Sequence, residues 1–370
     1  MQQPDTVQSG RLRSLDFTRG FIMVLLALES VGLYEHLMAA APPGSFSAGF
    51  LSQFFHKGWH GWRFWDLIQP LFMFMAGVAM AYSLNRQQQQ GITWRRQFLK
   101  ILRRAALLIF WGLFKRISDP EWFAIERLDV TDILTQLAFT TLIAFLIFRL
   151  SSWRQALVCV LILLLTDFMY RYFSAPGYEG GYTDGGNVGN YTDWLLFNQK
   201  THGYVFINWF PTAVHTIAGI MIGKHMSNRI AILPAALFSG AVLLLTGLIL
   251  DWSALIPIIK PVATASFVLV SLACCLFIFS LFYYLIDKRN LDPGIQFFSV
   301  VGMNAIFIYL FFDIVGRNWL NGYVAMVLTP VLSAFGAGNM LIPILCSLAT
   351  FAIEYGLCYF LYRRKIFFKL

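Results

Sequence analysis

Charged side chains are scarce in this chain: only 13% of its 370 residues are Asp, Glu, Lys or Arg, whereas 58% are hydrophobic. A soluble globular domain draws about a quarter of its residues from those four charged types. The chain therefore has too little polar surface to cover a globule in water. With 36 Phe and 11 Trp in addition, the composition predicts a polytopic membrane protein.

Several motifs are also missing. No GxxxxGK[ST] loop occurs, which excludes an ATPase of the P-loop type. No small-residue cleavage site precedes the first apolar run, so we expect no removed signal peptide. The few cysteines lie in or beside apolar runs without metal-type spacing, so we interpret them as packing residues and expect no redox or zinc chemistry. These cysteines are Cys159, Cys274, Cys275, Cys346 and Cys358.

What the chain has in abundance is long apolar runs, and a helix needs about 20 such residues to cross a bilayer. The runs predict an all-α polytopic membrane protein with about ten transmembrane helices. The predicted spans are 15–37, 64–84, 99–117, 130–148, 156–173, 206–222, 230–250, 261–286, 297–315 and 341–361. The apolar stretch 324–335 carries Pro330 and has about half the necessary length, which favours a short re-entrant or interfacial helix.

The net charge of +9 has a simple explanation in this topology. With ten spans and both termini cytoplasmic, 19 of the 28 Lys and Arg residues fall on the inner side, as the positive-inside rule expects. Contact with anionic lipid therefore accounts for the charge, and no nucleic acid is expected. The predicted organisation is a cytoplasmic tail, 1–14, and a single transmembrane domain, 15–370, with outer loops 38–63 and 174–205.

Ionisable residues within spans narrow the function, because each costs a few kcal/mol in hydrocarbon unless it faces a partner or a water-filled cavity. Asp16 and Arg19 lie one helical turn apart and can pair. Glu29 and His215 have no local partner, so we expect them to line a cavity. The outer loop 174–205 is rich in Gly, Asn, Asp and Tyr, which suits carbohydrate but equally suits any hydrated loop.

The stretch "HKGWHGWRFWDLIQP" brings titratable groups to the edge of the second span. His56 and His60 are four residues apart, but Gly58 and Gly61 argue against a helix there, so a zinc site is disfavoured. An interfacial histidine is ordinarily an anchor among tryptophans. Asp66, ten residues after His56, could instead hold its imidazole in one tautomer, as for a general base.

At these residues the chain resembles the membrane domain of the heparan-α-glucosaminide N-acetyltransferase family, including a bacterial NagX-type branch linked to N-acetylglucosamine transport. The most specific motif is His-x-x-Trp-x-Gly followed by Asp-Leu-Ile-x-Pro, from His56 to Pro70. The segments "RLRSLDFTRG", "KPVATASFVLV", "GMNAIFIY" and "LYRRKIFFKL" extend the likeness over nearly the whole chain. The resemblance implies a catalytic His56, acetyl-CoA as the cytoplasmic donor, an amino sugar acceptor outside, and a multi-pass location in a bacterial inner membrane.

The reaction that this resemblance implies suggests roles for further residues. Donors must meet the carbonyl oxygen, and Asn304 is the candidate. The phosphates of CoA need cations at the inner mouth, where Arg19, Arg103, Arg104 and Lys224 are available. For the sugar we expect contacts with Trp59, Trp209, Glu29 and His215. Glu29 stands where the family has an Asn, and an ionised carboxylate would repel a developing oxyanion.

Three hypotheses follow from the sequence. The first is a transmembrane acetyltransferase that moves an acetyl group from cytoplasmic acetyl-CoA to an amino sugar outside. The second is a carrier of N-acetylglucosamine or a related sugar that uses the same cavity, with Glu29 as a proton-coupling group. The third is a non-catalytic scaffold or a relative that modifies acyl lipids. Membrane lipid is an expected partner in all three, and a homodimer is compatible with each.

Overall fold

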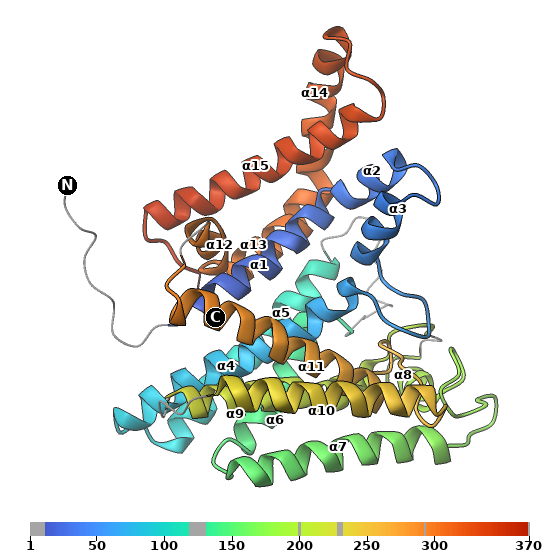
Figure 1. Ribbon diagram of the computed structural model, residues 1–370, viewed down its shortest axis with the longest axis vertical. Helices are drawn as coiled ribbons and strands as arrows, with labels where there is room; N and C mark the ends of the chain where they lie inside the picture. Colours follow the sequence, from blue (N-terminus) through green and yellow to red (C-terminus); the bar gives the residue numbers. More distant parts are fainter. Residues whose placement is uncertain (1–11, 118–130, 199–200, 228–231, 292–293, 369–370) are drawn as a thin grey trace.

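The computed structural model describes residues 12–117, 131–198, 201–227, 232–291 and 294–368, and within these ranges every regular element is helical (Figure 1). The first half contains α1 (Arg13–Ser30), α2 (Leu33–Ala40), α3 (Phe46–Leu51), η1 (Ser52–Phe54), η2 (Phe64–Leu67), α4 (Ile68–Gln89), α5 (Trp94–Ile117), α6 (Ile133–Leu146) and α7 (Ser152–Tyr172). The second half contains α8 (Val188–Phe197), η4 (Phe206–Asn208), α9 (Trp209–Ser227), α10 (Leu233–Trp252), α11 (Ala265–Phe282), η5 (Tyr283–Lys288), α12 (Ile295–Gly302), α13 (Ala305–Phe311), η6 (Phe312–Leu320), α14 (Asn321–Ala334) and α15 (Leu341–Arg363). Residues 1–11 of the predicted tail lie outside the described ranges.

Six helical segments are long and apolar enough to cross a membrane, and up to eight are if each bent pair counts as one span. The six are Phe64–Gln89, Ser152–Tyr172, Phe206–Met226, Leu233–Trp252, Ala265–Lys288 and Leu341–Arg363. The bent pairs are α1 with α2, which meet at 63°, and α12 with the helix Ala305–Ala334, which meet at 74°. These eight coincide with eight of the ten predicted spans. The membrane-protein class is confirmed, whereas the cytoplasmic placement of both termini stays a prediction.

The two other predicted spans are helical, but neither meets that standard, so a count of ten is not supported. The helix α5 begins "WRRQFLKILRR", and its basic residues lower its hydropathy, while α6 has only 14 residues.

The stretch 324–335 also differs from its prediction. It does not form a separate short helix, because α14 continues without a break the helical run that starts at Ala305.

Glycine lets the two central helices, α4 and α9, approach backbone to backbone. A Cβ atom built on Gly77 would lie 2.1 Å from the carbonyl oxygen of Thr216, and one on Gly219 would lie 2.1 Å from that of Phe74. Only a residue without a side chain permits such a contact, as in small-xxx-small packing of membrane helices. The helix α4, which follows the His56 loop, is thereby fixed in the core of the molecule.

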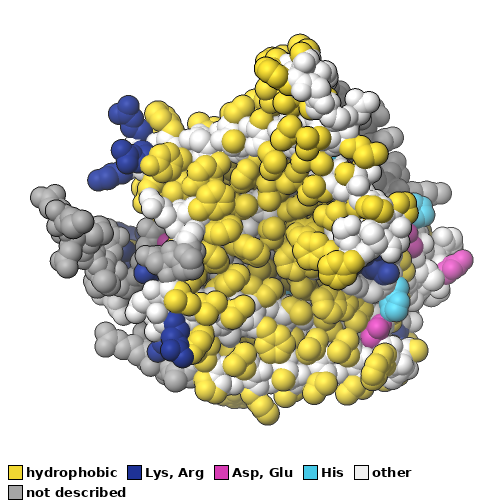
Figure 2. Space-filling model, turned by 45° about the horizontal axis from the view of Figure 1, so that its top comes forward, with side chains coloured by type: hydrophobic (Ala, Val, Ile, Leu, Met, Phe, Trp, Pro, Cys, Tyr) yellow, Lys and Arg dark blue, Asp and Glu magenta, His cyan; other side chains and the backbone are white. Residues whose placement is uncertain are grey.

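Basic and acidic side chains gather at different margins of the molecule. Figure 2 shows a broad hydrophobic band across one face, with most of its Lys and Arg side chains at the left margin and most of its His, Asp and Glu side chains at the right. Figure 1 places the end of α15 on the left and the loops around α8 on the right. The histidine-bearing rim therefore faces away from the basic rim, with the apolar band between them.

Candidate functional site

Asp66 lies in the first turn that leads into α4, and its carboxylate organises the loop before it. One oxygen, Oδ2, accepts hydrogen bonds from the backbone N–H of Arg63 at 2.9 Å and of Lys57 at 3.2 Å. A helix N-terminus favours a negative charge, because its free N–H groups point outward. The loop is consequently wrapped around a carboxylate that is only 1% exposed.

The other oxygen of Asp66 receives His56. The distance from Nδ1 of His56 to Oδ1 of Asp66 is 2.9 Å, and the imidazole is 51% exposed. A buried carboxylate bonded to Nδ1 leaves Nε2 on the open side of the ring, where it can accept a proton or attack a carbonyl carbon. The pairing predicted from the ten-residue spacing is present in the structure.

Lys260 completes this group and was not among the residues predicted from the sequence. Its Nζ lies 3.2 Å from Oδ1 of Asp66 and 3.1 Å from Nδ1 of His56, and its side chain is 6% exposed. The aromatic ring of Tyr204 contacts both, with its centroid 5.6 Å from the Lys260 ammonium and 6.4 Å from the centroid of the His56 ring. The sequence feature that could have pointed to Lys260 is a single lysine directly before a long apolar run.

Glu29 joins the same region from the end of α1. The indole Nε1 of Trp65 donates a hydrogen bond to Oε1 of Glu29 at 3.0 Å. His56 and Arg317 are near enough to interact electrostatically with this carboxylate. The structure thus brings together Glu29, His56 and Asp66, three of the predicted residues.

Trp59 connects the His56 loop to the loop around α8. Its indole N–H donates to the carbonyl oxygen of Tyr182 at 2.9 Å, and its ring packs against a small apolar cluster that includes Tyr170 and Val205. The hydroxyl of Tyr182 in turn donates to Asp167 at 2.5 Å. Burial, followed by this hydrogen bond, raises the pKa of Tyr182 above its ordinary value. Trp59 therefore joins the loop 38–63 to the loop 174–205.

Three predicted residues are held away from His56 by other contacts. His215 is fully buried, with Nε2 2.8 Å from the hydroxyl of Ser271, so it joins α9 to α11 and lines no open cavity. Trp209 stacks on Phe139 with 5.0 Å between ring centroids. The amide of Asn304 donates to the carbonyl of Ile366 at 3.1 Å and accepts from the N–H of Phe368 at 2.9 Å.

The structure places Asn304 near the beginning of α1, away from the end that carries Glu29. The neighbouring Gly302 abuts the backbone of Asp16 at the beginning of α1, whereas Glu29 lies at the other end of that helix. Thirteen residues of α-helix span about 20 Å. Asn304 instead anchors the C-terminal segment on the basic side of the molecule.

The predicted cationic residues fall into two groups. Arg19 and Arg104 lie close enough for their charges to repel, and Nε of Arg104 is buried without a hydrogen-bond partner among the described residues. Arg103 is exposed beside them. Lys224 is engaged elsewhere, since its ammonium donates to the carbonyl oxygens of Phe148 and Leu150 at 2.8 and 2.9 Å. Lys224 thus caps the end of α6, whereas Arg19 and Arg104 lie together.

A second charged cluster lies between α5, α6 and η6. The ammonium of Lys115 is 2.5 Å from Asp132 and 2.6 Å from Asp313, and the hydroxyl of Tyr309 lies 2.9 Å from it. Arg317, one turn beyond Asp313, is 3.9 Å from that carboxylate. The cluster provides a cation for two carboxylates, Asp132 and Asp313, that fall within the predicted spans 130–148 and 297–315.

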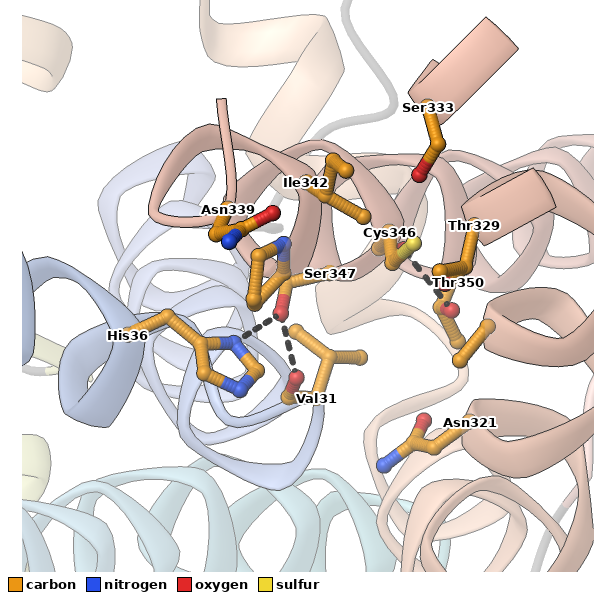
Figure 3. Close-up of a pocket in the computed structure, with 12 residues that line it drawn as sticks. Val31, His36, Asn321, Thr329, Ser333, Asn339, Ile342, Cys346, Ser347 and Thr350 are labelled. Atoms are coloured by element: carbon orange, nitrogen blue, oxygen red, sulfur yellow. Dashed lines mark hydrogen bonds between the residues drawn. The ribbon is translucent and has the colours of Figure 1, made fainter. Parts of the chain in front are cut away.

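A cavity of about 320 Å³ opens between α2, α14 and α15, on the far side of the α1–α2 bend (Figure 3). Its wall fixes that bend. Ser347 donates to the carbonyl oxygen of Val31 at 2.6 Å and contacts Nδ1 of His36 at 2.9 Å, while Asn321 donates to the carbonyl of Ser30 at 2.8 Å. These bonds satisfy carbonyl groups that the interrupted helix leaves free. The residues of the cavity wall thereby hold the backbone directly after Glu29 in place.

The two histidines that are four residues apart use different partners. Nε2 of His60 lies 2.8 Å from Asp251, whereas His56 binds Asp66. In the part of the chain that the structure describes, no group of three or more His, Cys, Asp or Glu side chains is arranged to hold a metal ion.

The fold and this site define a polytopic helical membrane protein with a histidine–carboxylate pair at one rim. Residues 11–248, more than half of the chain, match the family model described as heparan-alpha-glucosaminide N-acetyltransferase, catalytic, and the chain belongs to that family. It is 23% identical to the mouse heparan-alpha-glucosaminide N-acetyltransferase over the whole of this chain and 62% of the mouse protein. The human protein of the same name is 21% identical over 97% of this chain and 60% of its own length. The chain thus spans about three fifths of these relatives; the matched region includes His56 and Asp66, while Lys260 lies beyond it.

Proposed function

We propose that this protein transfers an acetyl group from acetyl-CoA, bound at the basic rim, to the amine of an amino sugar at the opposite rim. The observation that carries the proposal is the half-exposed imidazole of His56 held by the buried carboxylate of Asp66. Membership of the family supports this class of reaction. The proposed setting is a bacterial inner membrane with the basic rim in the cytoplasm.

The chemistry requires a base, because an ammonium group has no lone pair for attack. In one route, the acceptor ammonium first loses a proton to water, and the free amine attacks the thioester carbonyl while Nε2 of His56 takes a second proton from that nitrogen; the C–S bond breaks, and this second proton passes to the thiolate of CoA. In the other, Nε2 of His56 attacks the thioester carbonyl and displaces the CoA thiolate, and the free amine then takes the acetyl group from the imidazole and releases its proton to water. Asp66 orients the ring in both routes.

The donor would be held at the other end of α1. Arg19 and Arg104 together present two guanidinium groups, one with a buried nitrogen that has no partner among the described residues, and phosphate groups fit such a pair. Arg19 and Glu29 are ten residues apart on one helix, which corresponds to about 15 Å. A long flexible donor arm lying along α1 would connect the two rims.

A carrier of N-acetylglucosamine or a related sugar is the second candidate, and one observation favours it. Two spans are interrupted, α1 with α2 and α12 with the helix that follows, and the first break lies next to Glu29. Discontinuous helices that meet an ionisable group are typical of secondary carriers. In this alternative, Glu29 would carry the coupled proton.

Vesicles reconstituted with the protein distinguish the two functions. Acetyl-CoA is enclosed, labelled glucosamine is added outside, and acetylated sugar is measured by mass spectrometry. The acetyltransferase produces external N-acetylglucosamine, which disappears in His56→Ala and persists in His202→Ala, a control at a 77% exposed loop histidine. Uptake of unmodified N-acetylglucosamine without acetyl-CoA, together with no acetylation by the unaltered protein, would establish the carrier instead.

A further inference from the structure

The proposed acetyl transfer passes through a tetrahedral intermediate, whichever route forms it, and that intermediate needs a hydrogen-bond donor. Attack on the thioester carbonyl carbon moves an electron pair onto the carbonyl oxygen, and a donor already in place lowers the energy of this oxyanion. The sequence predicts Asn304 as the donor, but the structure bonds its amide to the C-terminal segment near the beginning of α1. A donor beside His56 has to come from another residue.

Three side-chain donors of the His56 loop and of the turn after it already have acceptors. The indoles of Trp59 and Trp65 and the guanidinium of Arg63 each donate to an oxygen of the protein, at 2.9, 3.0 and 3.4 Å. A new bond from any of them to a substrate would leave a protein oxygen without its partner, which is unfavourable in a partly buried site.

Tyr204 has a hydroxyl group that is not used in this way. Its ring lies beside both His56 and Lys260, 6.4 Å from the imidazole between centroids, at an angle of 70°, and 5.6 Å from the ammonium to the ring centroid. The phenol oxygen accepts a hydrogen bond from the ammonium of Lys260. The hydroxyl hydrogen of Tyr204 has no acceptor among the residues that the structure describes.

The backbone holds Tyr204 and Lys260 together, although 56 positions separate them in the sequence. The N–H of Val205, the next residue after Tyr204, donates to the carbonyl of Pro261, the next residue after Lys260, at 3.5 Å. The amide of Asn208 donates to the same carbonyl at 3.1 Å. Val205 is itself fully buried. The phenol is therefore fixed against the turn that carries the ammonium.

The charge of Lys260 makes this hydroxyl a stronger donor. The side chain of Lys260 is only 6% exposed, so water screens its charge weakly. A cation that donates to a phenol oxygen polarises the O–H bond on the other side of that oxygen. Burial raises the pKa of Tyr204 above its ordinary value, although the adjacent ammonium opposes that shift. The hydroxyl thus keeps its proton at neutral pH and is available to donate.

We infer that the hydroxyl of Tyr204 donates a hydrogen bond to the carbonyl oxygen of the acetyl group in the tetrahedral intermediate, with Lys260 as the positioning residue behind it. The carbonyl oxygen receives the electron pair of the C=O double bond on attack and returns it when the C–S bond breaks. Tyr204 keeps its proton throughout, so no proton has to be replaced. The inference rests on the proposed function, because it concerns one step of that reaction.

Tyr204→Phe tests the inference, because it removes the hydroxyl and keeps the ring. Acetyl transfer to glucosamine is measured in the reconstituted vesicles, with kcat and KM determined for both substrates. We expect kcat to fall by about 10²-fold, while both KM values stay within about threefold, since the bond exists only in the transition state and the intermediate. Tyr191→Phe is the matched control, because Tyr191 is an outer-loop tyrosine whose ring contacts Phe173 and Trp194. Its kcat should equal that of the unaltered protein.

An analogue of the intermediate gives a second measurement. In a CoA thioether that carries a trifluoroacetonyl group, the carbonyl is hydrated to a tetrahedral diol. We expect Tyr204→Phe to weaken inhibition by this compound by about the same factor as it lowers kcat/KM, because an analogue of the transition state loses the same interaction. Inhibition of Tyr191→Phe should not change.

Two results would overturn the role of Tyr204: an unchanged kcat in Tyr204→Phe, or a higher KM for either substrate with no loss of kcat. If Tyr204→Phe cannot be isolated in folded form, Tyr204→3-fluorotyrosine takes its place. This residue keeps the hydroxyl and makes the phenol more acidic, so kcat should rise, and an unchanged kcat would again contradict the inference. Absence of acetylated sugar from the unaltered protein would overturn the proposed function, and the inference with it.

Discussion

The indole of Trp65 donates its hydrogen bond to Glu29, joining the end of α1 to the turn that begins α4 at a distance of 3.0 Å. Trp65 is 2% exposed and also packs edge-on against the ring of Tyr34, 5.3 Å between centroids, on the far side of the α1–α2 bend. One buried side chain thus fixes Glu29 relative to Asp66, the next residue along the chain. The geometry of the site depends on this contact between distant segments.

Glu29→Gln should separate the two candidate functions, because glutamine retains an oxygen that can accept from Trp65 but cannot carry a proton. In an acetyltransferase, we expect kcat to stay within about threefold and KM for the cationic acceptor to rise, since a carboxylate that attracts ammonium is lost. In a proton-coupled carrier, uptake driven by a pH gradient should cease. The measurements are steady-state kinetics and gradient-driven uptake in the same vesicles. A fall in kcat as large as that of His56→Ala would contradict the acetyltransferase expectation.

His56→Ala and Asp66→Asn should both abolish most acetyl transfer, for different reasons. Loss of the base lowers kcat by about 10²- to 10⁴-fold. In Asp66→Asn the new amide can donate to Nδ1, which stabilises the tautomer with its proton on Nε2 and removes the exposed lone pair. We expect KM for acetyl-CoA to stay nearly constant in both, because the arginines lie at the opposite rim. Steady-state measurement of kcat and KM for both variants checks these expectations. An active Asp66→Asn variant would show that Asp66 does not set the tautomer of His56.

The pairing of His56 with Asp66 could be predicted because the two residues are ten positions apart at the end of one apolar run, so chain connectivity already keeps them close. Lys260 is 194 positions from Asp66, and no local pattern links them. Only the folded arrangement of α4 and the turn before α11 brings the lysine into the site.

The direction in which a side chain points from a span was harder to predict than the span itself. His215 and Asn304 lie in predicted spans as expected, but hydropathy does not tell which side of a helix meets a cavity and which meets another helix. Eight spans were found from apolar length, while the bends at Val31–Gly32 and after Gly302 were not. Each bend depends on hydrogen bonds from remote segments, such as the bond from Ser347 to Val31.

Lys115→Met should destabilise the protein strongly. The substitution leaves Asp132 and Asp313, whose side chains are 4% and 15% exposed, without the ammonium between them. Breaking a buried ion pair in this way costs about 3–5 kcal/mol. We expect a lower melting temperature in detergent, and partial recovery in the double variant Lys115→Met/Asp313→Asn, which removes one of the two remaining charges. An unchanged melting temperature for the single variant would show that the cluster is hydrated and contributes little.

Gly219→Ala tests the packing that holds α4 in the core. A methyl group at this position would meet the carbonyl oxygen of Phe74 at 2.1 Å, and a backbone atom cannot turn aside as the end of a side chain can. The helices must separate, which loosens the contacts along both and costs at least about 1–3 kcal/mol. Gly322→Ala is the matched control, because Gly322 is also helical and has no neighbouring atom within 4 Å of an added Cβ. We expect Gly219→Ala to lower the melting temperature in detergent and Gly322→Ala to leave it unchanged or raise it, since alanine favours a helix.

Equal melting temperatures for the two variants would mean that α4 and α9 are not in backbone contact. The helix that follows His56 and Asp66 would then not be held rigidly in the core.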